Sequence, residues 1–128
     1  MQETIDIWRK GRVIDMWSIP HFLFGILFAF VPYAIPLSLL EVFLIMVGIA
    51  LIWELGEYME GIRETIWNNI ADIILPIISY FLASHFLITY GLLPDQMTVL
   101  FVAVLMVYIF TNISGWLAYR RRVREFMH

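Results

Sequence analysis

Long hydrophobic stretches without a charged residue make up most of this chain, and short polar segments separate them. Three uncharged stretches cover residues 16–40, 73–94 and 96–119, and a shorter one covers residues 42–53. Each of the first three is long enough for a helix to cross a hydrocarbon core about 30 Å thick. The fourth is long enough only if its helix continues past Glu54, which places that carboxylate at the membrane boundary.

This pattern predicts an all-α fold, an integral membrane four-helix bundle that forms a single transmembrane domain over residues 1–128. Proline and glycine residues between the stretches mark the turns. The helices are expected at about residues 16–33, 37–61, 65–90 and 96–120. Apolar and basic residues alternate over residues 2–14, which predicts a short amphipathic helix lying in the membrane interface. Gly25 and Ala29 have the spacing of small residues that lets two membrane helices approach closely.

The basic residues indicate the orientation of the bundle. All eight lysines and arginines fall at residues 9–12, at Arg63 and at residues 120–124. With four spans these three places lie on one side of the membrane, whereas the connections near residues 32–37 and 91–96 carry no basic residue. Because basic residues accumulate in cytoplasmic segments, we expect a multi-pass protein of the cell membrane with both termini in the cytoplasm.

Composition excludes several kinds of site. The chain has no cysteine, so it has no disulfide, thiol nucleophile or cysteine-bound metal cluster. Its formal net charge is −3, and it contains no glycine-rich phosphate loop or nucleic-acid-recognition motif. The expected partner is therefore membrane lipid and not nucleic acid.

The polar residues that lie within or beside the hydrophobic stretches gather near the cytoplasmic ends of all four predicted helices. They are Asp15, His21, Glu54, Glu57, Asn68, Asp72 and Asn112. Ionisable groups are costly at membrane depth, so they are usually paired and often mark a functional site. Tryptophans at the same helix ends place this layer between the headgroups and about one helical turn below them. We expect a polar site that opens to the cytoplasmic leaflet.

The spacing of the acidic residues suggests which side chains meet. Glu54 and Glu57 are three residues apart and share a helical face, and Asn68 and Asp72 are four apart and share another. Together with the imidazole of His21, these carboxylates form a donor set for a divalent metal ion. The predicted metal ligands are His21, Glu54, Glu57 and Asp72.

Two other interpretations of the same residues stay open. His21, Glu54 and Asp72 would serve as catalytic acid–base groups, with Asp15, Asn68 and Asn112 binding the substrate. Asp15 would alternatively cap the first helix. In the simplest interpretation the polar groups only bond to one another and fix the packing of the helices, because such contacts set helix register in membranes.

The motifs D-x-W-x3-H-F-x2-G from Asp15, W-E-x2-E from Trp53 and N-x3-D from Asn68 resemble those of the VanZ-like and YjdF-like families of small membrane proteins. The resemblance covers about residues 15–75. It implies a polytopic membrane protein, linked in one branch to envelope-directed antibiotic resistance, and it implies no particular reaction.

These observations favour a small membrane protein whose acidic site, metal-dependent or not, acts on or binds lipid headgroups; they leave open whether it is an enzyme. One alternative is a conduit for ions, protons or metals, as a homo-oligomer, along Ser79, Ser84, His85 and Thr89. Another alternative is a structural or accessory subunit of a membrane complex.

Overall fold

The computed structural model describes residues 15–61 and 65–126, and within them the chain is helical, without a strand. The helices are α1 (Ser18–Ala29), α2 (Val31–Ala34), α3 (Leu39–Met59), α4 (Ile66–Tyr90) and α5 (Pro94–Phe126). The predicted all-α fold with four principal helices is therefore confirmed. The amphipathic helix expected at residues 2–14 lies outside the described residues.

Capping residues explain where α3 and α4 begin and end. Ser38 and Glu41 form a reciprocal capping box at the start of α3, and the hydroxyl of Thr65 accepts from the backbone N–H of Asn68 at the start of α4. Gly61 and Gly91 follow the two helices with φ angles of +81° and +54°. Glycine adopts this left-handed conformation without a steric cost, so it ends a helix cleanly.

The first and last helices differ from the predicted boundaries. The segment expected as one helix at 16–33 is divided at Phe30 into α1 and α2, with Pro32 in the first positions of α2, where its missing N–H does no harm. α5 begins at Pro94 for the same reason and runs through the arginines beyond residue 120. Arginine favours helix, so the basic segment continues α5.

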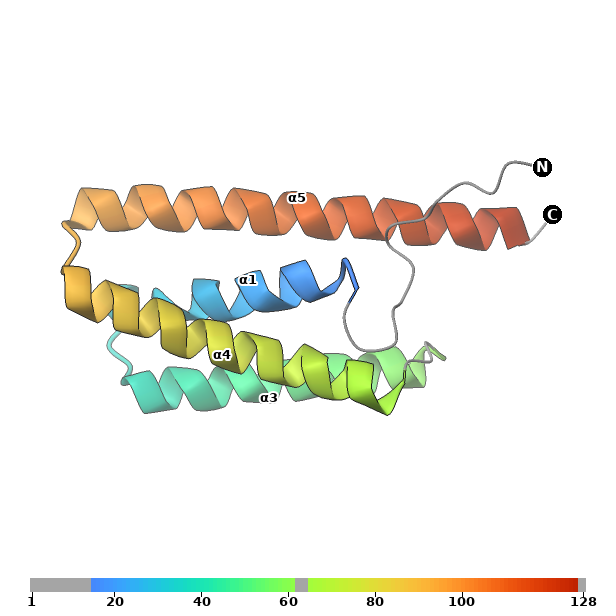
Figure 1. Ribbon diagram of the computed structural model, residues 1–128, viewed down its shortest axis with the longest axis horizontal. Coiled ribbons are helices and arrows are strands. Elements are labelled where there is room, and N and C mark those ends of the chain that lie inside the picture. Colours follow the sequence, from blue (N-terminus) through green and yellow to red (C-terminus); the bar gives the residue numbers. More distant parts are fainter. Residues whose placement is uncertain (1–14, 62–64, 127–128) are drawn as a thin grey trace.

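α1 is the central helix of the bundle. Its Cα atoms come within 8 Å of those of α3, α4 and α5, whereas α5 comes this close only to α1 among the described helices. Figure 1 shows α1 between α5 above and the pair α3 and α4 below. The start of α1, the end of α3, the start of α4 and the end of α5 lie at one end of the bundle, and the α2–α3 and α4–α5 connections lie at the opposite end (Figure 1).

A close contact joins α1 to α4 at Gly25. A Cβ atom at Gly25 would overlap the backbone carbonyl of Pro76 and the hydroxyl of Ser79. Ala29, one turn further along α1, is fully buried. The predicted close approach through small residues is therefore confirmed, and it draws the polar face of α4 against α1.

Apolar packing is concentrated toward the end of the bundle that holds the α1–α3 and α4–α5 connections. The core there contains Phe30, Val42, Met46, Tyr80 and Leu87. The Tyr80 hydroxyl donates a 2.6 Å hydrogen bond to the carbonyl of Leu39 and fixes α4 against the start of α3. The buried Asn68 and Asp72 lie in the other half of the bundle.

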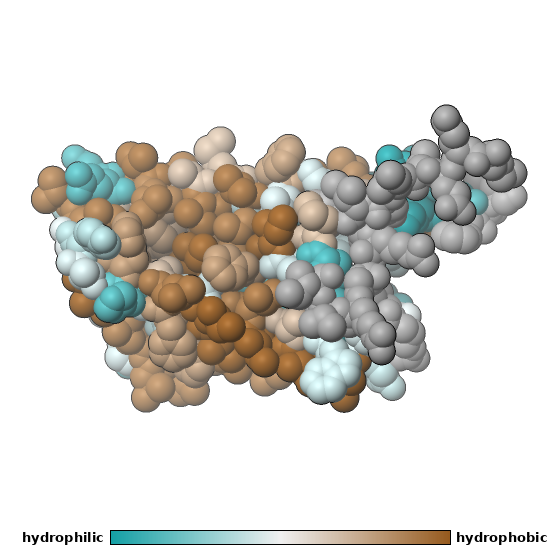
Figure 2. Space-filling model, viewed as in Figure 1, coloured by the Kyte–Doolittle hydropathy of each residue, from teal (hydrophilic) through white to brown (hydrophobic). Residues whose placement is uncertain are grey.

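The outer surface is strongly hydrophobic. α3, α4 and α5 are each long and apolar enough to cross a membrane, and the apolar segment Ser18–Ala34 is shorter. Large apolar side chains such as Leu44, Ile52 and Phe110 are more than half exposed. In Figure 2, hydrophobic residues (brown) cover the middle of the visible face, and hydrophilic residues (teal) lie toward its ends.

Candidate functional site

Three of the predicted site residues meet at the polar end of the bundle. His21 of α1, Glu54 of α3 and Asp72 of α4 each offer one donor atom, and these atoms lie within 4.8 Å of one another. Nε2 of His21 is 3.6 Å from Oδ1 of Asp72. The Asp72 side chain is completely buried, and that of His21 is 15% exposed. Residues 51 positions apart thus form one compact group.

The sequence around Asp72 accounts for its position. The Thr65 cap fixes the first turn of α4, so Asn68 and Asp72 follow on one face, at positions four residues apart. That face packs against α1, and both side chains are almost entirely buried as a result. The amide of Asn68 donates a 3.1 Å hydrogen bond to Oδ2 of Asp15.

Asp15 belongs to this polar group and does not cap α1. Trp17 is the residue that precedes the helix, and no side chain caps it. Instead, the backbone N–H of Asp15 donates to the hydroxyl of Ser18 at 3.1 Å, which shapes the entry into α1. Of the two roles predicted for Asp15, the structure thus favours membership of the site.

Glu57 lies beside the three-residue group without joining it. Its Oε1 accepts a 2.9 Å hydrogen bond from the indole N–H of Trp53, one turn earlier on α3. The structure therefore brings together three of the four predicted metal ligands and directs the fourth toward a tryptophan.

Asn112 is connected to the three-residue group by a cavity that it shares with His21. Its amide donates to the carbonyl of Tyr108 on its own helix at 2.7 Å. His21 and Asn112 both line a cavity of about 180 Å³ enclosed by α1, α3 and α5. A bound molecule in this cavity would touch both residues, so the predicted role of Asn112 in binding is compatible with its position.

A larger cavity of about 930 Å³ adjoins the first one. Trp17, Ile49, Trp53 and Asn112 line both. The larger cavity is also lined by Glu57, Glu60, Trp116, Tyr119 and Arg122. In the sequence, the aromatic residues indicate interface anchors, and the arginines near Arg122 indicate mainly the orientation of the bundle and also a surface for anionic lipid. Neither signal predicts a cavity. The spacing of Asn112, Trp116 and Tyr119 along one helical face was the signal that could have identified this wall of the cavity.

The donor set fits a divalent cation. Two ligands about 2.1 Å from one tetrahedrally coordinated ion lie about 3.4 Å apart. The His21–Asp72 distance of 3.6 Å is close to this value, and the donor atom of Glu54 lies within 4.8 Å of both. Two carboxylates and one imidazole suit zinc, manganese or iron, and the partly exposed side of His21 leaves room for a further ligand.

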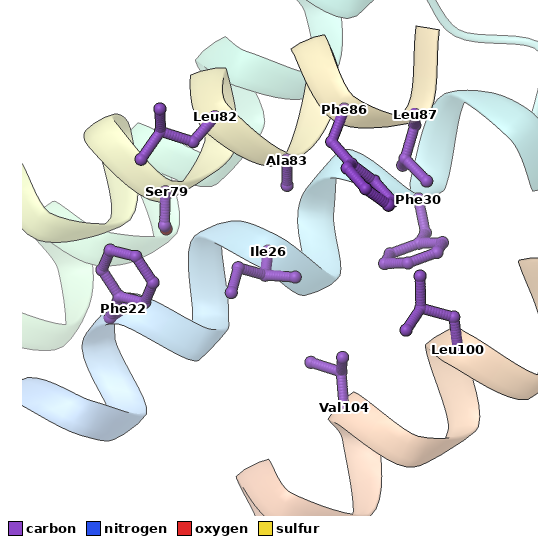
Figure 3. Close-up of a pocket in the computed structure, with 10 residues that line it drawn as sticks. All are labelled: Phe22, Ile26, Phe30, Ser79, Leu82, Ala83, Phe86, Leu87, Leu100 and Val104. Carbon is purple, nitrogen blue, oxygen red and sulfur yellow. The ribbon is translucent and has the colours of Figure 1, made fainter. Parts of the chain in front are cut away.

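A third cavity lies on the other side of the α1–α5 contact and has a different character. It measures about 270 Å³ and is enclosed by apolar residues of α1, α4 and α5, including Phe22, Phe86 and Leu100 (Figure 3). Its one lining hydroxyl, that of Ser79, donates to the carbonyl of Pro76 at 3.1 Å. No charged side chain lines it, so this cavity suits only apolar groups.

No protein-family model, curated protein or solved structure matches the chain. The resemblance to the VanZ-like and YjdF-like families therefore stays a prediction, and the function has to be argued from the site itself.

Proposed function

We propose that this chain is a multi-pass protein of the cell membrane, with both described chain ends on the cytoplasmic side, and that it binds a divalent cation through His21, Glu54 and Asp72. The apolar surface of α3, α4 and α5 supports embedding in a bilayer. The basic residues near both chain ends support the orientation, since cytoplasmic segments are rich in lysine and arginine.

The observation that carries the proposal is the meeting of donor atoms from three different helices within 4.8 Å. Two of the three groups are carboxylates, and one of these, Asp72, is fully buried. Burying charge is costly unless a counter-charge compensates it. A divalent cation would compensate both carboxylates at once, which makes it a better match for this group than a protonated imidazole alone.

The position of the group suggests what the cation would act on. His21 lies one helical turn from Trp17, and Glu54 follows Trp53 directly. Tryptophans favour the level of the lipid headgroups. A cation there would polarise a phosphate or ester oxygen of a lipid, which is the general way in which bound metals activate such groups.

The conduit alternative has less support. Ser79 and Ser84 are buried, but His85 and Thr89 of α4 are exposed on the outer surface of the described bundle. The polar positions that would extend a path beyond the site thus point in different directions. A binding or catalytic site at one membrane face explains the arrangement better.

The test is the metal content of detergent-purified protein, measured by mass spectrometry for the unmodified chain, His21→Ala and Glu54→Gln. We expect stoichiometric metal in the unmodified protein and its loss in both variants. Glu41→Gln is the matched control, because it makes the same change on the same helix at the exposed capping box, where glutamine also caps. A folded, metal-free unmodified protein would contradict the proposal.

A further inference from the structure

Building on the membrane cation site proposed above, we infer that the groove between α3 and α5 binds the headgroup of a zwitterionic phospholipid that carries an ammonium group. The ammonium would lie between the carboxylates and aromatic rings of the groove, and the phosphate beside Arg122. The lipid would thereby reach the cation site through His21, which lines the inner part of the same groove.

The groove results from the way that the helices pack. α3 and α5 each pack against α1, but in the part of the chain that the structure describes their Cα atoms nowhere come within 8 Å of each other. The space left between them holds the cavities of about 930 Å³ and 180 Å³, which share the wall formed by Trp17, Ile49, Trp53 and Asn112. Small-molecule sites usually enclose about 300–1,000 Å³, so the space is sufficient for a headgroup and the first part of a chain.

Charges of both signs line the larger cavity, on opposite walls. Glu57 and Glu60 come from the end of α3, and Arg122 comes from the end of α5. Arginine binds phosphate with strong charge-assisted hydrogen bonds, and carboxylates accept from ammonium groups. A ligand with one negative and one positive group, a short distance apart, matches this arrangement better than a purely anionic lipid, which would face two carboxylates.

Aromatic rings complete the ammonium side. Trp17, Trp53, Trp116 and Tyr119 all line the larger cavity. The rings of Trp116 and Tyr119 are stacked, with centroids 5.7 Å apart. Cations are attracted to the faces of such rings, and most strongly to tryptophan. Aromatic rings beside carboxylates are therefore a suitable environment for an ammonium group.

The position of the apolar lining residues indicates how a bound lipid would be oriented in the groove. Ile49 lines both cavities, and Phe24 and Tyr108 line the inner one. Arg122 lies ten residues beyond Asn112 along α5, or about 15 Å at 1.5 Å per residue. A lipid with its phosphate beside Arg122 would direct its glycerol region and acyl chain inward along the groove, toward His21 and Phe24. This is the orientation that a bilayer lipid has at the same leaflet.

The test is a titration of the detergent-purified full chain with dioleoyl phosphatidylethanolamine or dioleoyl phosphatidylglycerol, followed by native mass spectrometry. The two lipids have the same acyl chains, and only the first carries an ammonium group. We expect phosphatidylethanolamine to bind at least tenfold more tightly. Equal binding of the two lipids, or tighter binding of phosphatidylglycerol, would overturn the inference.

Variants locate the bound lipid in the groove. Gly56 lines the larger cavity, and a Cβ atom added there meets no atom within 4 Å, so we expect the Gly56→Leu side chain to extend into the groove without a clash at its Cβ. We expect it to weaken phosphatidylethanolamine binding at least tenfold. Gly48→Leu is the control on the same helix, since Gly48 has equal space and does not line the groove. Equal binding by the two variants would overturn the inference.

Charge variants test the two walls separately. Glu60→Gln should reduce the preference for phosphatidylethanolamine over phosphatidylglycerol at least threefold, and Arg122→Gln should weaken both lipids. Metal content is measured on the same samples. If a metal-free protein binds phosphatidylethanolamine preferentially, the proposed cation site is contradicted and the lipid site is supported. If a metal-loaded protein shows no preference between the two lipids, the lipid site is contradicted and the cation site is supported.

Discussion

The side-chain amide of Asn68 donates a 3.1 Å hydrogen bond to Oδ2 of Asp15, a residue 53 positions earlier in the chain. Asn68 is completely buried, and Asp15 stands directly before the segment that leads into α1. The contact thus joins the start of α1 to the first turn of α4, next to His21 and Asp72. It couples the stability of the bundle to the geometry of the candidate site.

Asn68→Asp should destabilise the protein at neutral pH. The substitution replaces the amide donor with a second carboxylate facing Asp15, and breaking a buried hydrogen bond in this way costs about 1–3 kcal/mol. Thermal unfolding in detergent at neutral pH measures the effect.

Asn69→Asp is the control for this prediction. Asn69 is the next residue of α4 and is exposed, so the same change of charge occurs without burial. A negative charge in the first turn of a helix is neutral or slightly stabilising. If Asn68→Asp and Asn69→Asp unfold at the same temperature, the contact with Asp15 contributes nothing to stability.

Alanine substitutions at Gly25, Gly115 and Gly48 should change the free energy of unfolding by different amounts, with the largest loss at Gly25. At Gly25 the new Cβ overlaps the backbone carbonyl of Pro76, which cannot move without separating α1 from α4. Overpacking of this kind costs about 1–3 kcal/mol. At Gly115 the three atoms nearest the new Cβ belong to the far edge of the Trp17 ring, which can shift, so the loss should be smaller.

Gly48→Ala is the third member of this series. Nothing lies within 4 Å of the added Cβ, and alanine favours helix over glycine by about 1 kcal/mol, so stability should rise. Unfolding by denaturant in mixed micelles gives the free energy of unfolding of each variant. An equal effect at all three positions would mean that α1 and α4 do not approach as closely as the structure describes.

The sequence was sufficient to predict most of the fold, because the signals for helix position are local. Hydrophobic stretches show where helices run, and Gly61 and Gly91 show where α3 and α4 end, since both glycines adopt positive φ angles. The break at Phe30 was missed. Pro32 signalled it, but a proline early in a helix and a proline after one look alike in sequence.

The candidate site was predictable only in part, because its geometry depends on how the helices rotate about their axes. Glu54 and Glu57 share a face of α3, yet the structure directs one toward His21 and the other toward Trp53. Which carboxylate enters the group follows from the packing of α3 on α1, and no local pattern encodes that rotation. The groove was missed for the same reason, since it depends on α5 packing closely against α1 while its backbone stays apart from that of α3.

Glu57→Gln should leave metal binding intact, in contrast to Glu54→Gln. Glutamine keeps the oxygen that accepts from the Trp53 indole, so the side chain can stay in place. Glu57 also lies outside the group of three donor atoms. Mass spectrometry of the two purified variants compares their metal content. Equal loss in both would make Glu57 a fourth ligand, as the sequence alone suggests.

The orientation of the bundle can be tested because the chain has no cysteine. Gln96→Cys and Arg124→Cys place single thiols at exposed positions on opposite ends of α5. They are separated by about 42 Å at 1.5 Å per residue, which exceeds a hydrocarbon core of about 30 Å. A membrane-impermeant maleimide should label Gln96→Cys in intact cells and Arg124→Cys only after lysis. The reverse pattern would place the candidate site on the outer face, and labelling of both in intact cells would contradict a membrane-spanning α5.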